Sequence, residues 1–284
     1  MEYTIITTFH PAGLAQYGQT MIDSFDQYWP KSVRLLVYAE NCVPRVPSDR
    51  VQVTDLLSAC PDLVAFKNRH KNNAMANGLV AKDTGVPFKD NAFKWDAVRF
   101  SHKVFAVIHA CATVATDWVI WLDADTKTFA PVPESFLATV CDPRSLACYL
   151  GRREKYHSEC GWVAYNRGHS DLTSFMTQWR DLYVNDRLFD LREYHDSFLF
   201  DELRRRFQQQ GVYFHNLSPE LPGKGPGHPF IASALGQYMD HMKGSKRKAL
   251  GHSLPDDHDR NHGLNASVPY WQSIFHKPPG LTRR

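Results

Sequence analysis

The feature that most constrains the fold of this chain is a run of large apolar residues that ends at two carboxylates. The sequence WVIWL occupies residues 118–122, and Asp123 and Asp125 follow it with one alanine between them. An apolar run of this length between polar residues is typical of a strand that is buried on both faces. The two aspartates therefore stand where a buried strand leaves the core, which is where open α/β sheets bind ligands.

The spacing of Asp123 and Asp125 allows both carboxylates to bind one cation, because alternate residues of an extended chain point to the same side. Magnesium-type ions are commonly held by one or two carboxylates together with the phosphates of a substrate. The pair therefore indicates a metal–diphosphate site. The alternative is a solvated turn or a helix cap, as in many Asp-x-Asp pairs. The rigid apolar strand before the pair favours the metal.

The composition is that of a globular protein with a large core. The 284 residues are 43% hydrophobic and 13% aromatic, which suits one α/β domain or one domain with an elaborated second half. The net charge of +3 does not require nucleic acid or a membrane as partner. None of the six cysteines forms a C-x-x-C pair, so we expect reduced cysteines and no structural zinc. Without a signal-peptide pattern or a membrane-length apolar segment, we expect a soluble, cytoplasmic protein.

Apolar periodicity predicts alternating strands and helices. We expect strands at residues 3–9, 33–38, 51–53, 118–122, 146–150, 161–165 and 212–217. We expect helices at residues 16–29, 96–115, 170–184 and 195–209. The polar residues 67–91 predict a loop or an irregular helix, and the Gly-, Pro- and His-rich residues 222–229 predict a loop over the active face. The opening strand–helix–strand order predicts parallel strands with right-handed crossovers.

This order of elements, with Asp123-Ala124-Asp125 after its apolar strand, resembles the nucleotide-sugar-dependent glycosyltransferases of the GT-A fold over about residues 3–247. The resemblance implies a Rossmann-like α/β fold with a mixed, mainly parallel sheet flanked by helices and an irregular basic C-terminal segment. It also implies a nucleotide-sugar-binding and catalytic domain at residues 1–217. Residues 218–284 would pack on the same domain and contact metal and phosphate.

Residues 241–247, HMKGSKR, are similar to the His-x-x-Gly-x-x-Lys segment of some members of that family. In the family, the Asp-x-Asp motif and this histidine bind Mn²⁺ or Mg²⁺, and the basic residue binds the diphosphate. The resemblance therefore implies Asp123, Asp125 and His241 as metal ligands and Lys243, Gly244, Lys246 and Arg247, with Asp123, as donor-binding residues. Arg247 stands at the family's lysine position and Lys246 one place before it, and either cation can bind phosphate. The alternative is a basic surface turn with an incidental histidine.

Arg99 and Lys103 lie four residues apart on the helix that precedes the carboxylate pair. They resemble the basic positions that orient the donor in this family. The alternative is a solvated helix face.

Two segments of this chain resemble the segments that form the acceptor side of the site in this family. They are a Gly-containing strand from Glu159 to Asn166 and the start of the helix at His195 and Asp196. The resemblance implies Glu159, His195 and Asp196 as catalytic residues. An inverting enzyme needs a base close to the acceptor hydroxyl, whereas a retaining enzyme can use the carboxylate to orient its substrates. His195 could be the base or bind the sugar, and Asp196 could instead be a helix N-cap. The stereochemistry stays open.

The activity that the resemblance implies is metal-dependent transfer of a hexose from a nucleotide diphosphate donor, UDP-glucose by default, to an acceptor hydroxyl. Residues 238–248 are also similar to glycosyltransferases encoded by tailed phages. This implies hydroxymethylated pyrimidines in DNA as acceptor and the host cytoplasm as location, with phosphate contacts from residues 67–71, 204–206 and the basic tail. A glycan, a lipid-linked sugar or a protein is an equally open acceptor.

Two other classes of function remain open. A sugar-nucleotide nucleotidyltransferase shares the doubly wound sheet and the carboxylate-bound metal, but it normally has a Gly-rich basic loop where this chain has residues 9–13, FHPAG. A non-catalytic protein would bind a nucleoside diphosphate or nucleic acid without hydrolysing or transferring a sugar.

Overall fold

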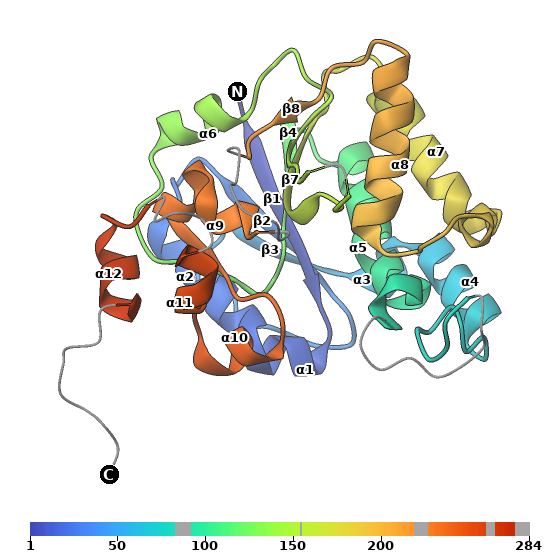
Figure 1. Ribbon diagram of the computed structural model, residues 1–284, viewed down its shortest axis with the longest axis horizontal. Helices are drawn as coiled ribbons and strands as arrows, with labels where there is room; N and C mark the ends of the chain where they lie inside the picture. Colours follow the sequence, from blue (N-terminus) through green and yellow to red (C-terminus); the bar gives the residue numbers. More distant parts are fainter. Residues whose placement is uncertain (83–91, 154, 219–226, 260–264, 276–284) are drawn as a thin grey trace.

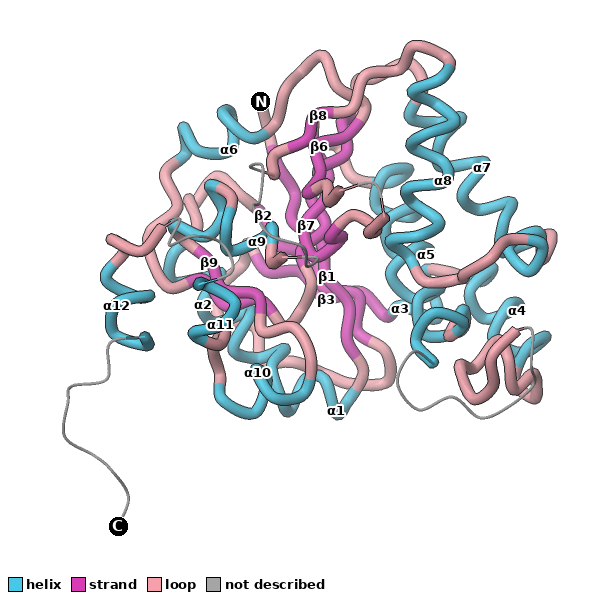
Figure 2. Tube along the Cα trace, viewed as in Figure 1, coloured by secondary structure: helices cyan, strands magenta, loops and turns pink. Residues whose placement is uncertain are grey.

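The fold is built around a seven-stranded sheet (Figure 1). A computed structural model describes residues 1–82, 92–153, 155–218, 227–259 and 265–275, so most of the loop predicted at residues 222–229 lies outside the described residues. The strands of this sheet are β1 (Tyr3–Phe9), β2 (Arg34–Ala39), β3 (Val51–Asp55), β4 (Trp118–Leu122), β6 (Ala147–Leu150), β7 (Glu159–Asn166) and β8 (His215–Asn216). Their order is β3-β2-β1-β4-β7-β6-β8. Figure 2 shows the strands in the middle of the molecule with helices on either side. Neighbours are parallel except where β7 runs antiparallel to β4 and β6. The sheet is therefore mixed and mainly parallel, as expected.

Helices cover both faces of the sheet (Figure 1). One face packs against α3 (Leu56–Ala59), α4 (Pro61–His70), α5 (Ala97–Thr113), α7 (Leu172–Val184) and α8 (Asp196–Gln209). The other face packs against α2 (Gln19–Tyr28), α6 (Glu134–Val140), α9 (Pro229–Ala232) and α12 (Pro269–Phe275). The remaining helices are α1 (Pro11–Gly13), α10 (Ser245–Leu250) and α11 (Pro255–Asp259), with a π-helical turn at Leu14–Gly18 and 3₁₀ turns at Ala92–Trp95, Arg187–Asp190 and Ala234–Gln237.

The central strand β4 is buried along its whole length, as its apolar sequence predicts. Val119 and Trp121 join the core on the α5 side, whereas Ile120 and Leu122 join the core on the α2 side. A shift of one residue would exchange these two sets, so packing on both faces fixes the register. The position of Asp123, whose backbone N–H donates to the Gly161 carbonyl at 2.9 Å, is fixed with it.

A small second sheet holds part of the C-terminal region beside the segment that follows β4. It pairs β5 (Thr126–Thr128) with β9 (Met239–His241) in antiparallel register, with Thr126 opposite His241. On the face of β9 away from His241, the buried carboxylate of Asp240 accepts hydrogen bonds from Ser253 and from the Tyr270 hydroxyl. The short strand was not expected from the sequence, because three residues with a charge at their centre give no apolar signal.

One helix was not predicted in full, and one predicted strand is shorter in the structure. Residues 67–70 belong to α4, whose buried residues are Leu63, Phe66 and His70. Residues 67–70 were expected as part of a loop or an irregular helix and residues 61–66 were not assigned, because the third core position of α4 is a histidine, whose ring packs on Phe66 and Phe189. At residues 212–217 a longer strand was expected, but only His215 and Asn216 pair with β6.

None of the helices in the described part of the chain combines the length and the apolarity that a membrane crossing needs. All six cysteines are unpaired, and five of them are buried, where they pack as small apolar residues.

A testable consequence for stability concerns Glu40, which follows β2 and bonds to His102 and Lys67. His102 is the larger influence, and together the two partners lower the pKa of Glu40 from 4.5 to about 2. A carboxyl with a lowered folded-state pKa stabilises the fold above its unfolded value, and this contribution is lost as the pH falls toward the folded value. We expect Glu40→Gln to reduce the free energy of unfolding by roughly 1–2 kcal/mol at pH 7, after screening by solvent, and to have little effect near pH 2.

Urea unfolding followed at both pH values measures this difference, with the exposed carboxylate variant Asp49→Asn as control. An equal effect of Glu40→Gln at both pH values would contradict the expectation.

Candidate functional site

A cavity of 560 Å³ opens at the carboxyl ends of the parallel strands. The walls come from β4, β7, α5, the start of α8 and the segment after β9. Of the residues predicted for the site, Arg99, Lys103, Asp123, Asp125, His195, Asp196, His241, Lys243 and Gly244 line the cavity. Residues far apart in the sequence are thus brought together at one edge of the sheet. A second hollow, of 920 Å³, lies at the opposite edge, beside the amino ends of β1 and β2.

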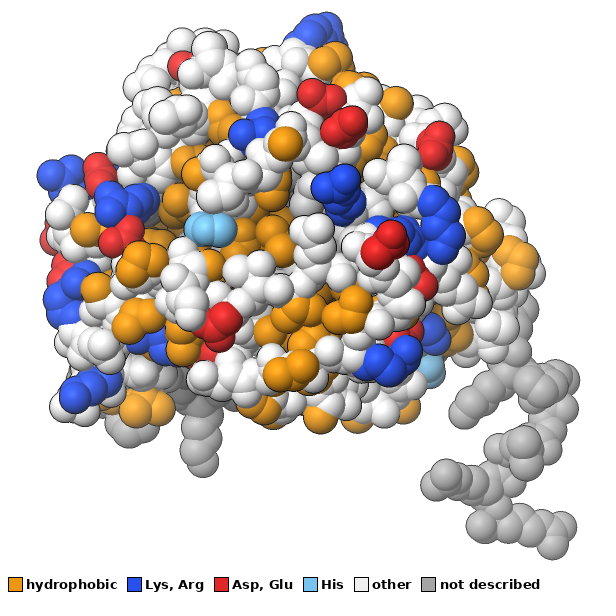
Figure 3. All heavy atoms as spheres, turned by 180° about the vertical axis from the view of Figure 1, so that it is seen from behind, with side chains coloured by type: hydrophobic (Ala, Val, Ile, Leu, Met, Phe, Trp, Pro, Cys, Tyr) orange, Lys and Arg blue, Asp and Glu red, His pale blue; other side chains and the backbone are white. Residues whose placement is uncertain are grey.

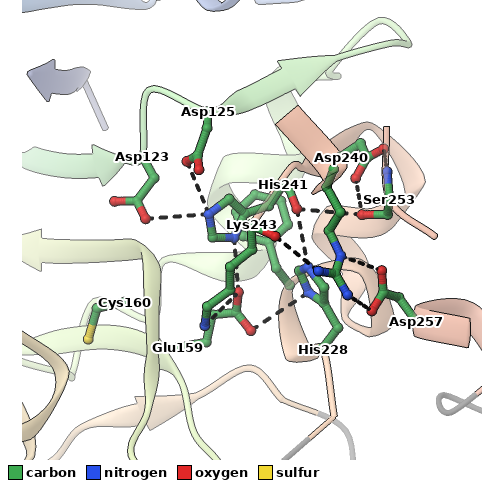
Figure 4. Close-up of polar contacts among 12 residues, drawn as sticks. Asp123, Asp125, Glu159, Cys160, His228, Asp240, His241, Lys243, Ser253 and Asp257 are labelled. Carbon is green, nitrogen blue, oxygen red and sulfur yellow. Dashed lines mark hydrogen bonds and ion pairs between the residues drawn. The ribbon is translucent and has the colours of Figure 1, made fainter. Parts of the chain in front are cut away.

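Asp123, Asp125 and His241 converge within this cavity (Figure 4). His241 Nε2 lies 3.4 Å from Asp123 Oδ2 and 3.2 Å from Asp125 Oδ1. The β5–β9 pairing holds this arrangement, because the N–H of Met242 donates to the Asp125 carbonyl at 2.9 Å. Two carboxylate oxygens and one imidazole nitrogen can therefore reach a common point.

Glu159 determines which nitrogen of His241 faces the aspartates. The Nδ1 atom of His241 lies 2.9 Å from Glu159 Oε1, on the side of the ring away from Asp123 and Asp125 (Figure 4). Because the ionised carboxylate only accepts, Nδ1 carries a proton and donates it. A carboxylate behind a histidine in this way is common at metal centres, where it fixes the tautomer and makes the ligand nitrogen more basic. Glu159 is fully buried and bonds to Arg152 on its other oxygen.

The His241 ring occupies space that only a glycine in β7 leaves free. A Cβ atom on Gly161 would lie 2.6 Å from Cε1 and 2.8 Å from Nδ1 of His241. Both distances are too short for any side chain. The glycine in this strand is therefore required by the close approach of the histidine ring.

The charges of this group depend on one another. Burial lowers the pKa of His241, but Asp125, Asp123 and Glu159 outweigh it and raise the pKa well above its ordinary value. Burial raises the pKa values of Asp123 and Asp125, and their cationic neighbours, chiefly Lys103 and His241, bring both below the usual range. The positive charge between the aspartates is thus held strongly. A divalent cation fits the same place, with two anionic oxygens and a nitrogen whose orientation is already set.

Lys103 joins the metal group to the start of α8. Its ammonium lies 3.4 Å from Asp123 Oδ1 and 2.7 Å from Asp196 Oδ2, and it also donates to the Cys160 carbonyl. The side chain is buried, so Lys103 does not lie on a solvated helix face. Arg99, one turn earlier, is exposed at the cavity.

The basic candidates near the C-terminus lie in different surroundings. Lys243 and Gly244 line the cavity, whereas Lys246 and Arg247 are not among the described residues that do. Arg247 forms an ion pair with Asp257, and Lys246 is exposed. Lys248, which the sequence analysis did not single out, lines the cavity with its ammonium 2.9 Å from Asp125 Oδ2. The choice among these cations for diphosphate binding stays a prediction.

The acceptor-side candidates also differ. His195, not Asp196, caps α8, since its Nδ1 accepts from the Phe198 N–H at 3.3 Å. Its Nε2 lies 3.0 Å from Glu193, so both ring nitrogens are engaged. Asp196 faces the cavity beside Lys103, whereas Glu159 is not among the described residues that line it. Their catalytic roles stay predictions.

Several cavity residues were missed in the sequence analysis, among them Tyr17, Arg152, His157, Glu193 and Lys248. Arg152 follows the end of β6, which is parallel to β4, so a charged residue just after a strand was a usable signal. The other residues have no comparable mark in the sequence.

No protein-family model and no curated protein matches the chain. Glycosyltransferases are found among similar solved structures. The apo form of mouse xyloside xylosyltransferase 1 aligns with a TM-score of 0.46 and 11% identity over 77% of this chain and 86% of that chain. A glycosyltransferase involved in the glycosylation of the major capsid of PBCV-1 aligns with a TM-score of 0.44 and 12% identity over 94% of this chain and 100% of that chain. The glycosyltransferase GlyE of Streptococcus pneumoniae aligns with a TM-score of 0.42 and 12% identity over 76% of this chain and 45% of that chain.

The contact between Gly161 and His241 generates a test of the metal group. In Gly161→Ala the new methyl group would displace the His241 ring, so we expect Mn²⁺ affinity to fall about 10- to 100-fold, as when a supporting contact of a ligand is lost. Isothermal titration calorimetry measures the change. In the control variant Gly168→Ala, the nearest atom to the new Cβ lies 3.4 Å away, at the Asn166 side chain. Unchanged affinity in Gly161→Ala would show that His241 is not a ligand.

Proposed function

We propose that this protein is a metal-dependent glycosyltransferase that moves a sugar from a nucleotide diphosphate donor, UDP-glucose by default, to an acceptor hydroxyl. The observation that carries the proposal is the convergence of Asp123, Asp125 and His241 on one point of a cavity at the carboxyl edge of the sheet. The imidazole nitrogen favours a transition metal, so Mn²⁺ fits this set better than Mg²⁺. Held by Asp123, Asp125 and His241, the cation would act as a Lewis acid for the diphosphate of the donor.

The protein's own cations supply the rest of the leaving-group site. When the bond from the anomeric carbon to the phosphate oxygen breaks, negative charge develops on the diphosphate. The anomeric carbon bonds to the acceptor oxygen, and the proton of the acceptor hydroxyl passes to a base or to the departing phosphate. Lys243 and Lys248 are the basic C-terminal residues that line the cavity. Fixed cations placed where charge develops lower the barrier, because no solvent must reorganise. We therefore favour Lys243 and Lys248 over Lys246 and Arg247 for this role.

Among the three catalytic candidates, the geometry favours Asp196 as the carboxylate that faces the acceptor. It lines the cavity, and Lys103 links it to Asp123 on the donor side. Glu159 instead positions His241. His195 has both nitrogens engaged and so has no free lone pair with which to take a proton. The stereochemical outcome stays open.

A screen of donor hydrolysis over nucleotide sugars with Mn²⁺ and Mg²⁺ tests the proposal. With the donor identified there, we expect Asp125→Asn to lower the rate of hydrolysis about a hundredfold or more. The variant loses a ligand of the cation, and the charge that develops on the diphosphate then loses the cation that stabilises it. Asp171→Asn changes a carboxylate near the start of α7, outside the cavity, and should leave the rate unchanged. Binding of nucleoside diphosphate without hydrolysis of any donor would favour the non-catalytic alternative. Release of pyrophosphate from a nucleoside triphosphate and a sugar phosphate would favour the nucleotidyltransferase.

For the acceptor, hydroxymethylated pyrimidine in DNA is the first candidate to test. Lys67 and Arg205, which were assigned to phosphate contacts, form ion pairs with Glu40 and Glu202. On the face shown in Figure 3, the coloured Lys and Arg side chains alternate with Asp and Glu and form no continuous basic surface among the described residues. A DNA strand would find no continuous basic track on this face.

The logarithm of the binding constant for DNA containing hydroxymethylcytosine should fall linearly with the logarithm of the salt concentration. Unmodified DNA of the same sequence is the control. Absence of binding at low salt would remove DNA and leave a glycan, a lipid-linked sugar or a protein. We also propose that residues 1–217 form the nucleotide-sugar-binding and catalytic domain and that residues 218–284 form a segment that contacts the metal and the phosphates.

A further inference from the structure

A second group of metal-ligating side chains lines the same cavity, apart from the Asp123, Asp125 and His241 group. His157, Glu193 and His195 each place one ligand atom within 4.8 Å of the others. Two imidazole nitrogens and one carboxylate oxygen, with a further position left open, are the donor set of many catalytic zinc sites. We propose that these three residues bind a second divalent cation of the zinc class, with its open position toward the cavity.

The spacing of the ligand atoms suits such an ion. His157 Nε2 lies 3.5 Å and His195 Nε2 3.0 Å from the same oxygen, Oε2 of Glu193. Ligands at zinc–nitrogen distances of about 2.0–2.1 Å in a tetrahedron are about 3.3 Å from one another. The two nitrogen–oxygen separations lie on either side of this value, and the two nitrogens lie within 4.8 Å of each other, so coordination would require the side chains to draw together.

The backbone explains why the three side chains meet. Glu193 and His195 are alternate residues of the segment before α8, and His195 has the extended angles φ −72° and ψ 155°. Alternate residues of an extended segment point to one side, while Tyr194 between them is fully buried. His157 comes from the segment before β7, and its ring lies 5.1 Å from that of His195. The arrangement of Glu193 and His195 repeats the spacing of Asp123 and Asp125.

The outer contacts of the group also resemble those of metal sites. The other carboxylate oxygen of Glu193, Oε1, lies 3.4 Å from Lys94 and 3.5 Å from Arg192, which leaves Oε2 for a ligand role. The buried Nδ1 of His157 makes no hydrogen bond among the described residues and lies 3.9 Å from Asp201 Oδ2. A carboxylate behind the non-ligating nitrogen is the usual partner of a metal-bound histidine.

The proton on His195 must move when a metal binds. The Nδ1 atom accepts from the Phe198 N–H at 3.3 Å, so without metal Nε2 carries the proton and donates to Glu193. Coordination through Nε2 requires the ring proton on Nδ1, and the cap bond of α8 is then given up. That single long bond is weak compared with coordination of a transition metal. If no metal binds, the group is only a hydrogen-bonded helix cap, and the experiment decides between the two.

Cobalt(II) is the probe, because four-coordinate cobalt absorbs visible light strongly and replaces zinc. In Asp125→Asn, which disables the first site, we expect one equivalent of Co²⁺ to bind with this absorption and Zn²⁺ to displace it. Adding Glu193→Gln or His157→Gln should abolish the signal, whereas adding His215→Gln, a histidine outside the cavity, should not. Neither His157 nor Glu193 supplies the cap of α8, and circular dichroism verifies that each variant is folded.

The proposal is overturned if Asp125→Asn binds no Co²⁺, or if the signal persists in both Glu193→Gln and His157→Gln. Should Asp125→Asn not fold, the same titration compares the wild-type protein with Glu193→Gln, and the expected loss is one equivalent. The inference does not depend on glycosyl transfer, since cobalt binding is measured without any donor. A chain that lacks transferase activity could still show the second site, and an active one could lack it.

Discussion

The site depends on one interaction, the placement of the His241 ring between two aspartates on one side and Glu159 on the other. It joins the ends of β4, β7 and β9, and all its members are charged; Asp125, Glu159 and His241 are buried, whereas Asp123 is partly exposed. Removing one partner from such a buried group leaves uncompensated charge, a loss of about 3–5 kcal/mol. Apolar side chains would stabilise this edge of the sheet more simply, so we interpret the group as one retained for cation binding.

The second organising contact is the ammonium of Lys103, which reaches both Asp123 and Asp196. A single buried cation thus connects Asp123, which we assign to the donor side, with Asp196, which we assign to the acceptor side. Because its charge is shared, a change at either carboxylate alters the field at the other. Glu193 and His195 of the proposed second cation site directly precede Asp196 in the sequence. One short segment therefore contributes to both halves of the cavity.

Local pattern predicted the elements with strong apolar signals. The bounds of β1 and β4 agree with those expected, and α5, α7 and α8 differ from expectation by one or two residues at their ends. The apolar pattern failed where a polar side chain occupies a core position, as His70 does in α4. It also failed at β9, whose three residues are a strand only because β5 lies beside them.

The sequence by itself determined that a buried strand ends in Asp123 and Asp125, because an apolar run and its polar boundary are local features. Resemblance added His241 as a candidate. Only the tertiary structure decided that His241 meets the two aspartates, that Gly161 makes room for its ring and that Lys248 rather than Arg247 lies at Asp125. The physical reason is that these contacts arise from strand pairing and packing between segments far apart in the chain. Hydrophobic periodicity reports which face of a segment is buried, but not which other segment will cover it.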